Sequence, residues 1–392
     1  MRTGPGFLGV SLLAVMLLWG GAAPAQAPTP AAAPAACGAP AARDDGWAVA
    51  RPEDEGLDPG LLCGLAQRLQ APERPNLHAV LVVRHGRLVF EHYAAGEDES
   101  WGRPLGRVEH GPDDLHDQRS VSKSVTALLA GIAIGRGLIA GVDEPVTGFF
   151  PEYADLRTPE RDRILLRHLL AMSTGLEWDE ERHPYGDPLN SETGMSRSAE
   201  PYRFALEQPV VAPPGTRYKY SGGATALLAK IVAKAAGEPL EEFARTALFE
   251  PLGITAFEWR RLRNGDVAAA SGLRLRPRDM AKIGQLVLQG GAWNGRQVVP
   301  ATWIREMTTP KVTGQGAFLY GYQWWLGRSF VAGRELSWAA AVGLGGQRTF
   351  VVPDLDLVAV VTAGLYRDRT QMGETLGVLN HAVLPAALKP SE

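Results

Sequence analysis

The stretch "RSVSKSVTALLAGIAIGRG" (residues 119–137) decides the fold, because a small polar cluster leads directly into a long apolar run. The apolar residues recur at the spacing of one helix face, and Gly135 and Gly137 end the run. We therefore predict a helix with one buried stripe that begins directly after Ser120. The stripe consists of Val121, Val125, Leu128, Leu129 and Ile132.

Ser120 stands at the start of this helix, and Lys123 follows one turn later. Residues three apart on a helix are neighbours, so the Lys123 amine can reach the Ser120 hydroxyl. A buried lysine can lose its proton and act as a base, and the positive end of the helix dipole favours negative charge on the serine oxygen. The pair is the single S-x-x-K match in the chain. In the alternative interpretation, Ser120 only caps the helix and Lys123 points into water.

Two further stretches carry groups that a serine nucleophile needs. "YKYSGG" (residues 218–223) precedes an apolar helix pattern, so Tyr218 or Tyr220 can project a hydroxyl into a cleft and shuttle a proton, although either residue can equally be a packing residue. "AVGLGGQ" (residues 341–347) holds three glycines between two strand patterns. Their backbone N–H groups can approach a ligand as in an oxyanion hole, or the glycines simply form a hairpin turn.

Strand patterns at both ends of the chain enclose a helical middle. We expect a helix over residues 59–69, a β-hairpin over 78–95 that turns at His85-Gly86, a polar loop up to about residue 118, and further strands between about 335 and 363 with a last helix from about Thr370. The fold class is therefore α/β (α+β). One antiparallel sheet is built from both termini and flanked by helices, and a mainly helical lobe is inserted over about 120–310. A cleft between the lobes is the natural site.

The N-terminal residues have the layout of a secretory signal, with Arg2, an apolar segment from Phe7 to Trp19, and small residues before an expected cleavage near Ala25. The alternative, a membrane anchor, needs about 20 apolar residues. We therefore predict a signal peptide over residues 1–25, an Ala/Pro-rich flexible leader over 26–44 and one folded domain over 45–388, in a periplasmic or secreted protein. Cys37 and Cys63 either form a disulfide, or Cys37 is free and Cys63 is buried in the core.

In this order and spacing, the three stretches resemble the serine hydrolases of the β-lactamase and penicillin-binding-protein superfamily, in particular class C β-lactamase-like enzymes, family VIII esterases and 6-aminohexanoate-dimer hydrolases. The likeness runs from about Trp47 to Ala386 and implies a β-lactamase-like fold. By this resemblance Ser120 is the acylated nucleophile, Lys123 its base partner and Tyr220 the proton relay to the leaving group. The oxyanion donors are then the backbone N–H groups of Ser120 and Leu344.

The chain departs from that family pattern at two positions. Gly222 replaces the asparagine of the Y-x-N motif, and Ala341 replaces the cation of the K-T-G motif, which argues against recognition of a β-lactam or D-Ala-D-Ala carboxylate. The predicted substrate contacts are Tyr185, Trp178, Gly343, Gly345 and Trp325.

Charge and histidine spacing exclude several other classes. The net charge is −3 and no basic run is present, so nothing indicates nucleic acid or an anionic membrane as a partner. None of the eight histidines forms H-E-x-x-H or another compact ligand pattern, so we expect no metal site and no cofactor.

The sequence thus predicts an exported serine hydrolase that cleaves a small ester or amide through an acyl-enzyme. A homodimer is compatible with the sequence, which does not fix the oligomeric state. The alternatives are a β-lactamase or D-Ala-D-Ala peptidase, and a non-catalytic penicillin-binding-like module of the cell envelope.

Overall fold

The structure is a computed structural model that describes Met1, residues 37–71 and residues 74–388. The predicted signal peptide, apart from Met1, and the first part of the predicted leader lie outside these residues. Within the described ranges, none of the helices has the length and apolarity needed to cross a membrane.

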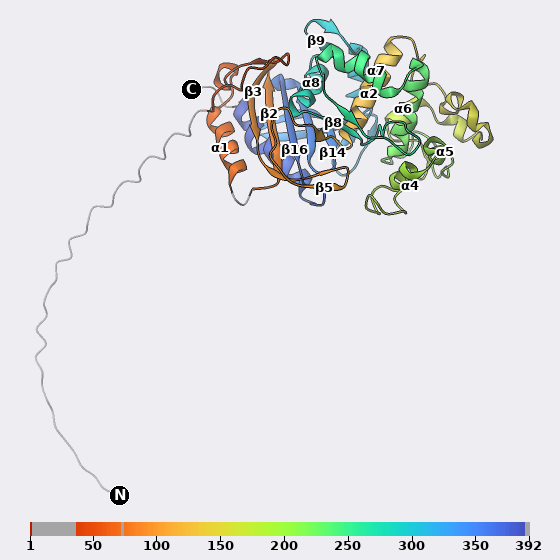
Figure 1. Cartoon of the computed structure of the whole chain (residues 1–392), viewed down its shortest axis with the longest axis horizontal. Coiled ribbons are helices and arrows are strands. Elements are labelled where there is room, and N and C mark those ends of the chain that lie inside the picture. The colour runs from red at the N-terminus through yellow and green to blue at the C-terminus, as the bar shows by residue number, and fades with distance from the viewer. Residues whose placement is uncertain (2–36, 72–73, 389–392) are drawn as a thin grey trace, which may run out of the picture. The chain divides into compact units, whose positions relative to one another are not determined.

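The large sheet has nine strands in the order β1-β3-β2-β16-β15-β14-β13-β12-β11, so strands from both ends of the chain meet in its middle (Figure 1). Neighbouring strands are antiparallel except β1 and β3, which are parallel and make the sheet mixed. The prediction of one sheet built from both termini is confirmed. The strands are β1 (Ala48–Val49), β2 (Leu77–Arg84), β3 (Arg87–Tyr93), β11 (Val312–Thr313), β12 (Leu319–Tyr320), β13 (Trp325–Val331), β14 (Arg334–Gly343), β15 (Gln347–Val352) and β16 (Leu357–Ala363).

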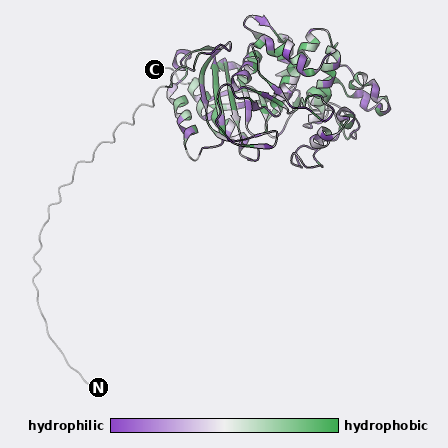
Figure 2. Cartoon of the chain, in the orientation of Figure 1, coloured by the Kyte–Doolittle hydropathy of each residue, from purple (hydrophilic) through white to green (hydrophobic). Residues whose placement is uncertain are grey.

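Helices cover both faces of this sheet, and its central strands are accordingly hydrophobic on both faces (Figure 2). Along β2, Leu81 and Val83 belong to the core shared with α2 and α8, whereas Val80 and Val82 belong to the core shared with α1, α10 and α11. The helices are α1 (Pro59–Gln70), α2 (Val121–Gly135), α3 (Leu166–Leu170), α4 (Ser191–Arg197), α5 (Pro201–Leu206), α6 (Gly222–Ala236), α7 (Leu240–Ala244), α8 (Pro277–Leu288), α9 (Ala301–Met307), α10 (Gln371–Val378) and α11 (Leu384–Leu388).

Helix α2 differs from its prediction in one respect. It begins directly after Ser120, as expected, but every residue from Val121 to Ala133 is buried rather than one stripe. Small side chains make this possible, because they let α6, α9 and the sheet approach α2 from different sides. At Gly131, for example, a Cβ atom would collide with the indole of Trp303 on α9.

The predicted polar loop between the first hairpin and α2 contains strands instead. β4 (Gly96–Ser100) and β5 (Arg103–Val108) form a second hairpin, and β6 (His116–Asp117) joins β7 (Glu258–Trp259) and β8 (Leu273–Leu275) in a small sheet. Trp101 and Gly102 turn this hairpin with φ values of 52° and 84°, as a tight hairpin turn requires. The loop prediction was wrong because the strands are rich in charged residues, which hide the strand pattern even where opposite charges face each other across the pair, as Glu97 and Arg107 do. A further small hairpin consists of β9 (Ala292–Trp293) and β10 (Arg296–Gln297).

Cys37 and Cys63 form a disulfide, with their Cα atoms 5.5 Å apart, which decides between the two alternatives that the sequence left open. The residues after Cys37 contact the folded body as well. The carbonyl oxygen of Ala41 accepts a hydrogen bond of 2.8 Å from Arg278, and Arg43 forms an ion pair with Asp113. Residues 37–44, the end of the predicted leader, therefore lie against the domain.

Candidate active site

Ser120 and Lys123 face each other at the N-terminus of α2. The Lys123 Nζ atom lies 3.1 Å from Ser120 Oγ and donates a second hydrogen bond of 2.9 Å to the carbonyl oxygen of Ala270. The Ser120 side chain makes no capping hydrogen bond, and Lys123 is 1% exposed. The alternative of a capping serine with a solvated lysine is therefore wrong, and the hydroxyl remains available to a substrate.

Tyr220 completes this group, whereas Tyr218 does not. Lys123 Nζ lies 4.8 Å from the centre of the Tyr220 ring. Burial raises the pKa of Tyr220, and the Lys123 charge and the hydrogen bonds with Ser120 and Lys123 lower it only in part. The ring of Tyr218 packs instead against Tyr320, at 5.3 Å between ring centroids. Of the two candidate tyrosines, Tyr220 is the one placed beside the nucleophile.

The protonation of Lys123 depends on the negative groups around it. Burial alone lowers its pKa, but Tyr220, Glu192 and Glu180 outweigh burial, so the pKa of Lys123 is raised. Because the pKa of Tyr220 is raised too, the resting site at neutral pH holds an ammonium on Lys123 and a neutral phenol on Tyr220.

Glu180 and Glu192 are site residues that the sequence analysis missed. Both Glu180 oxygens lie 3.0 Å from the backbone nitrogen of Gly222, which donates to them, and Glu192 accepts a hydrogen bond of 2.7 Å from Ser271 Oγ. The two carboxyls also hydrogen-bond each other. Burial and the neighbouring Glu192 raise the pKa of Glu180. Burial also raises the pKa of Glu192, but the hydrogen bond with Glu180 and the charge of Lys123 outweigh burial, so the pKa of Glu192 is lowered overall. The proton that the two carboxyls share is therefore on Glu180.

The carboxyl groups of Glu180 and Glu192 explain why glycine stands at position 222, where the family's Y-x-N motif has asparagine. A Cβ atom there would lie 2.6 Å from Glu180 Oε1 and 2.6 Å from Glu192 Oε2. No side chain fits in that space, so the amide of the Y-x-N motif has been replaced by two carboxyl groups that share one proton. Both residues lie in polar stretches that resemble ordinary surface loops, which is why no pattern singled them out.

The glycine-rich turn after β14 lies against the residues that precede Ser120. A Cβ atom at Gly343 would collide with the carbonyl oxygen of Gln118, so the close approach there requires glycine. Gly345 has a φ of 88°, and its N–H donates a hydrogen bond of 2.7 Å to the Gln371 side chain. The Gly345 N–H is therefore engaged within the fold and is not free to bind a substrate oxygen.

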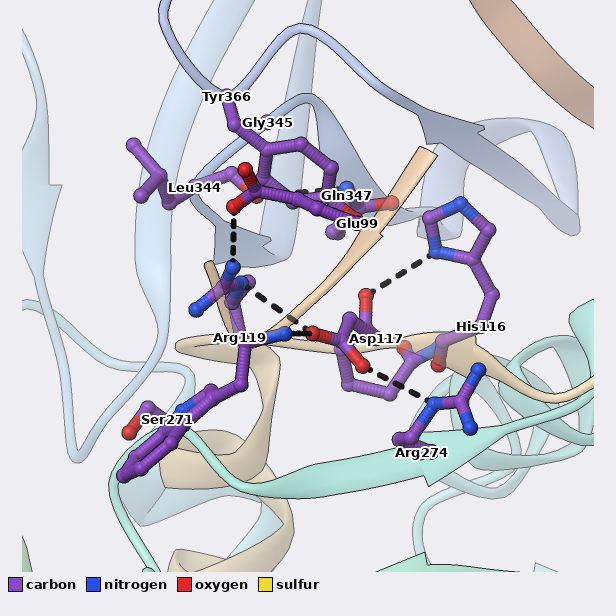
Figure 3. Close-up of polar contacts among 12 residues, drawn as sticks. Glu99, His116, Asp117, Arg119, Ser271, Arg274, Leu344, Gly345, Gln347 and Tyr366 are labelled. Carbon is purple, nitrogen blue, oxygen red and sulfur yellow. Dashed lines mark hydrogen bonds and ion pairs between the residues drawn. The ribbon is translucent and has the colours of Figure 1, made fainter. Parts of the chain in front are cut away.

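Arg119 holds the backbone in place directly before Ser120. Figure 3 shows its guanidinium between Glu99 and Asp117, with contacts of 2.6 Å and 3.5 Å. It also lies 4.9 Å from the ring centroid of Tyr366. Arg119 has a φ of 49°, an uncommon conformation for a residue with a side chain, and these contacts offset its cost.

The remaining predicted contacts divide into two groups. Trp325 lies beside the catalytic group, with its ring centroid 6.1 Å from that of Tyr220. Tyr185 is 46% exposed as a residue, and burial of its phenol with the nearby charges of Glu180 and Glu192 raises its pKa. Trp178 is buried and packs beneath the start of α6, so the structure does not bring it to a surface that a substrate can reach.

The chain is similar to known proteins in sequence and in fold. A family model described as "Beta-lactamase" matches residues 67–374. The 6-aminohexanoate-dimer hydrolase of Paenarthrobacter ureafaciens is 28% identical over 319 residues, which cover 76% of this chain and 74% of that one. A candidate 6-aminohexanoate-dimer hydrolase from Bacillus anthracis superposes with a TM-score of 0.65 at 21% identity, covering 80% and 79% of the two chains. EstCE1, a hydrolase with promiscuous acyltransferase activity, superposes with a TM-score of 0.62 at 17% identity, covering 80% of this chain and 96% of its own.

Proposed function

Since the chain belongs to the beta-lactamase family, whose named relatives include hydrolases, we propose that it cleaves a small ester or amide through an acyl-enzyme on Ser120. The observation that carries the proposal is the 3.1 Å contact between Lys123 Nζ and Ser120 Oγ, with Tyr220 beside both. A nucleophile within hydrogen-bond reach of its base is the arrangement that acyl transfer requires.

The reaction takes place in two steps. The Ser120 oxygen attacks the substrate carbonyl and loses its proton to the Lys123–Tyr220 pair, and the backbone N–H groups of Ser120 and Leu344 stabilise the oxyanion. The pair returns the proton to the leaving alcohol or amine. Water then attacks the acyl group and gives its proton to the pair, which returns this proton to the Ser120 oxygen as the acid product leaves.

We expect kcat/KM to rise with pH. In the resting site both Lys123 and Tyr220 are protonated, so the pair must lose one proton before it can act as a base. The pKa values of both groups are raised. The reactive form is therefore a minor species at neutral pH, and its population grows about tenfold per pH unit until the first proton is lost. Initial rates of p-nitrophenyl butyrate hydrolysis between pH 6 and 9, corrected for hydrolysis without enzyme, measure this. A flat profile, or one that falls above pH 7, would contradict it.

The carboxyl pair favours substrates without a carboxylate next to the scissile bond. Glu180 and Glu192 fill the space beside Gly222, the position of the asparagine in the family's Y-x-N motif. Ala341 supplies no cation. An anionic β-lactam would therefore encounter negative charge and would find no positively charged partner for its carboxylate.

A fluorophosphonate probe and a small substrate panel test the proposal. The probe is expected to add once, on the peptide that contains Ser120, as mapped by mass spectrometry. Rates on p-nitrophenyl butyrate or a linear amide are expected to exceed the rate on nitrocefin. The absence of any adduct, with this probe or with a fluorescent penicillin, would instead favour a non-catalytic binding module.

A further inference from the structure

Three histidines and one aspartate from separate parts of the sequence converge below the active site. His78 lies on β2, Asp98 on β4 and His116 on β6, and His110 lies between β5 and β6. One nitrogen or oxygen of each lies within 4.8 Å of the corresponding atom of all the others. The side chains of all four are buried, with His110 the most exposed at 7%.

The tautomers of two of these histidines follow from their neighbours. The Asn76 side-chain nitrogen donates to the carbonyl of Glu97, so its oxygen is the atom that faces His78 Nε2, at 3.2 Å. His78 Nε2 must therefore carry a hydrogen. His116 Nδ1 faces the carbonyl of Asp117 at 3.1 Å and must carry one too.

With these tautomers, the nitrogen lone pairs of His78 and His116 point at each other. His78 Nδ1 and His116 Nε2 are 2.8 Å apart, and in neutral rings both are acceptors. Such a contact is repulsive unless a cation lies between them.

The other two side chains complete a four-point cage. Asp98 Oδ1 lies 3.7 Å from His116 Nε2 and 4.0 Å from His78 Nδ1. His110 Nε2 lies 4.0 Å from Asp98 Oδ2 and is a buried nitrogen without any hydrogen-bond partner among the described residues. An unpartnered buried nitrogen that lies beside a carboxylate and two other histidines is suited to metal binding.

We propose that His78, Asp98, His110 and His116 bind one Zn²⁺ ion in a closed, four-coordinate structural site. Zinc takes imidazole and carboxylate ligands at about 2.0–2.1 Å in a tetrahedron, which separates the ligand atoms by about 3.4 Å. The cage atoms are separated by between 2.8 Å and at most 4.8 Å, on both sides of that value. Three imidazoles with one carboxylate suit zinc rather than calcium or magnesium, which prefer oxygen ligands.

The surroundings hold the ligands as a metal site requires. Asn76 and the Asp117 carbonyl orient two of the rings from outside, and Tyr366 donates a hydrogen bond of 3.1 Å to Asp98. A Cβ atom at Gly96 would lie 2.6 Å from the ring of His78, so β4 passes tightly over that ligand. In Figure 3, His116 lies on the far side of Asp117 from Arg119, so the site adjoins the segment that leads to Ser120 without facing the substrate.

The prediction of no metal site was based on sequence spacing, and spacing could not have revealed this cage. Its members stand at positions 78, 98, 110 and 116, and three strands are needed to bring them together. The proposal is independent of the hydrolase chemistry, because none of the four side chains contacts Ser120, Lys123 or Tyr220 in the interactions described above.

Metal content and zinc binding of the full chain test the proposal. We expect protein purified without chelator to contain about one zinc per chain by elemental analysis. After removal with dipicolinate, we expect rebinding of one equivalent to raise the melting temperature. His110→Gln removes a ligand that makes no hydrogen bond, so the variant is expected to fold and to bind zinc roughly 100-fold more weakly or worse. Asn76→Ala keeps all four ligands but loses the orienting contact to His78 and the hydrogen bond to the Glu97 carbonyl, and its zinc affinity is expected to fall about 10-fold to 100-fold.

His92→Gln is the matched control, because His92 is a half-buried histidine on β3 outside the cage, and this variant is expected to bind zinc like the original chain. Cobalt substitution adds a second readout, since a tetrahedral Co²⁺ site has an intense visible spectrum, which His110→Gln is expected to lose. The proposal is overturned if the chain neither retains zinc nor gains thermal stability from it. Equal zinc affinity in His110→Gln and the original chain would overturn it as well.

Discussion

Replacing Ser120 with alanine is expected to lower kcat by roughly 10⁴-fold or more, since the acyl-enzyme can no longer form. The fold should be unaffected, because the Ser120 side chain caps no backbone N–H and its hydrogen bonds are with Lys123 and Tyr220, within the site itself. Initial rates on the best substrate of the panel measure the loss, and the melting temperature and circular dichroism of the variant verify the fold.

Ser124→Ala is the matched control on the same helix. The Ser124 hydroxyl donates a hydrogen bond of 2.7 Å to the carbonyl of Gln323, so its removal is expected to cost about 1 kcal/mol of stability. Turnover should persist, because Ser124 does not contact Lys123. A Ser120→Ala variant that retains activity, or a Ser124→Ala variant that folds and loses it, would place the nucleophile elsewhere.

Replacing Lys123 with methionine is expected to lower kcat by roughly 10³-fold, the usual contribution of a positioned acid–base group. Methionine keeps the length of the side chain but leaves Ser120 without its base partner and the Ala270 carbonyl without its donor. It also removes the cation that lowers the pKa of Glu192, so Glu192 should take up a proton more readily in the variant. Steady-state kinetics of the purified variant measure the effect.

Lys282→Met separates this effect from the general cost of removing a buried lysine. Lys282 is also fully buried and pairs with Asp279 at 2.9 Å, but it lies on α8. Its removal is expected to destabilise the fold by roughly 3 kcal/mol and to leave kcat within twofold. If the loss of activity in both lysine variants were proportional to their loss of stability, Lys123 would have no chemical role.

Local patterns predicted most of the fold. The 3.6-residue periodicity placed the start of α2, and the alternation around His85-Gly86 placed the hairpin of β2 and β3. The hairpin of β4 and β5 was missed because charged residues obscure a strand pattern when their partners lie across the pair. The large sheet could be inferred because strands at both ends of the chain enclose a helical middle.

The site was predictable only where residues close in space are also close in sequence. Ser120 and Lys123 share one helical turn, so spacing alone brings them together. Glu180, Glu192 and the histidine cage depend on tertiary contacts between distant segments, and in the sequence each member looks like a polar surface residue. The fit between Gly222 and the two carboxyls depends on the space beside the Gly222 backbone, which only the folded structure defines.

The placement of β2 beside β16 also constrains when the protein can fold. Val80 is paired with Val361, and the backbone of Asp58, before α1, donates a hydrogen bond to the carbonyl of Ala386 in α11. Because these contacts join the two ends of the chain, a ribosome-bound nascent chain lacks the partners that close its sheet. The sheet is therefore completed only after β16, its last strand in sequence order, has been synthesised.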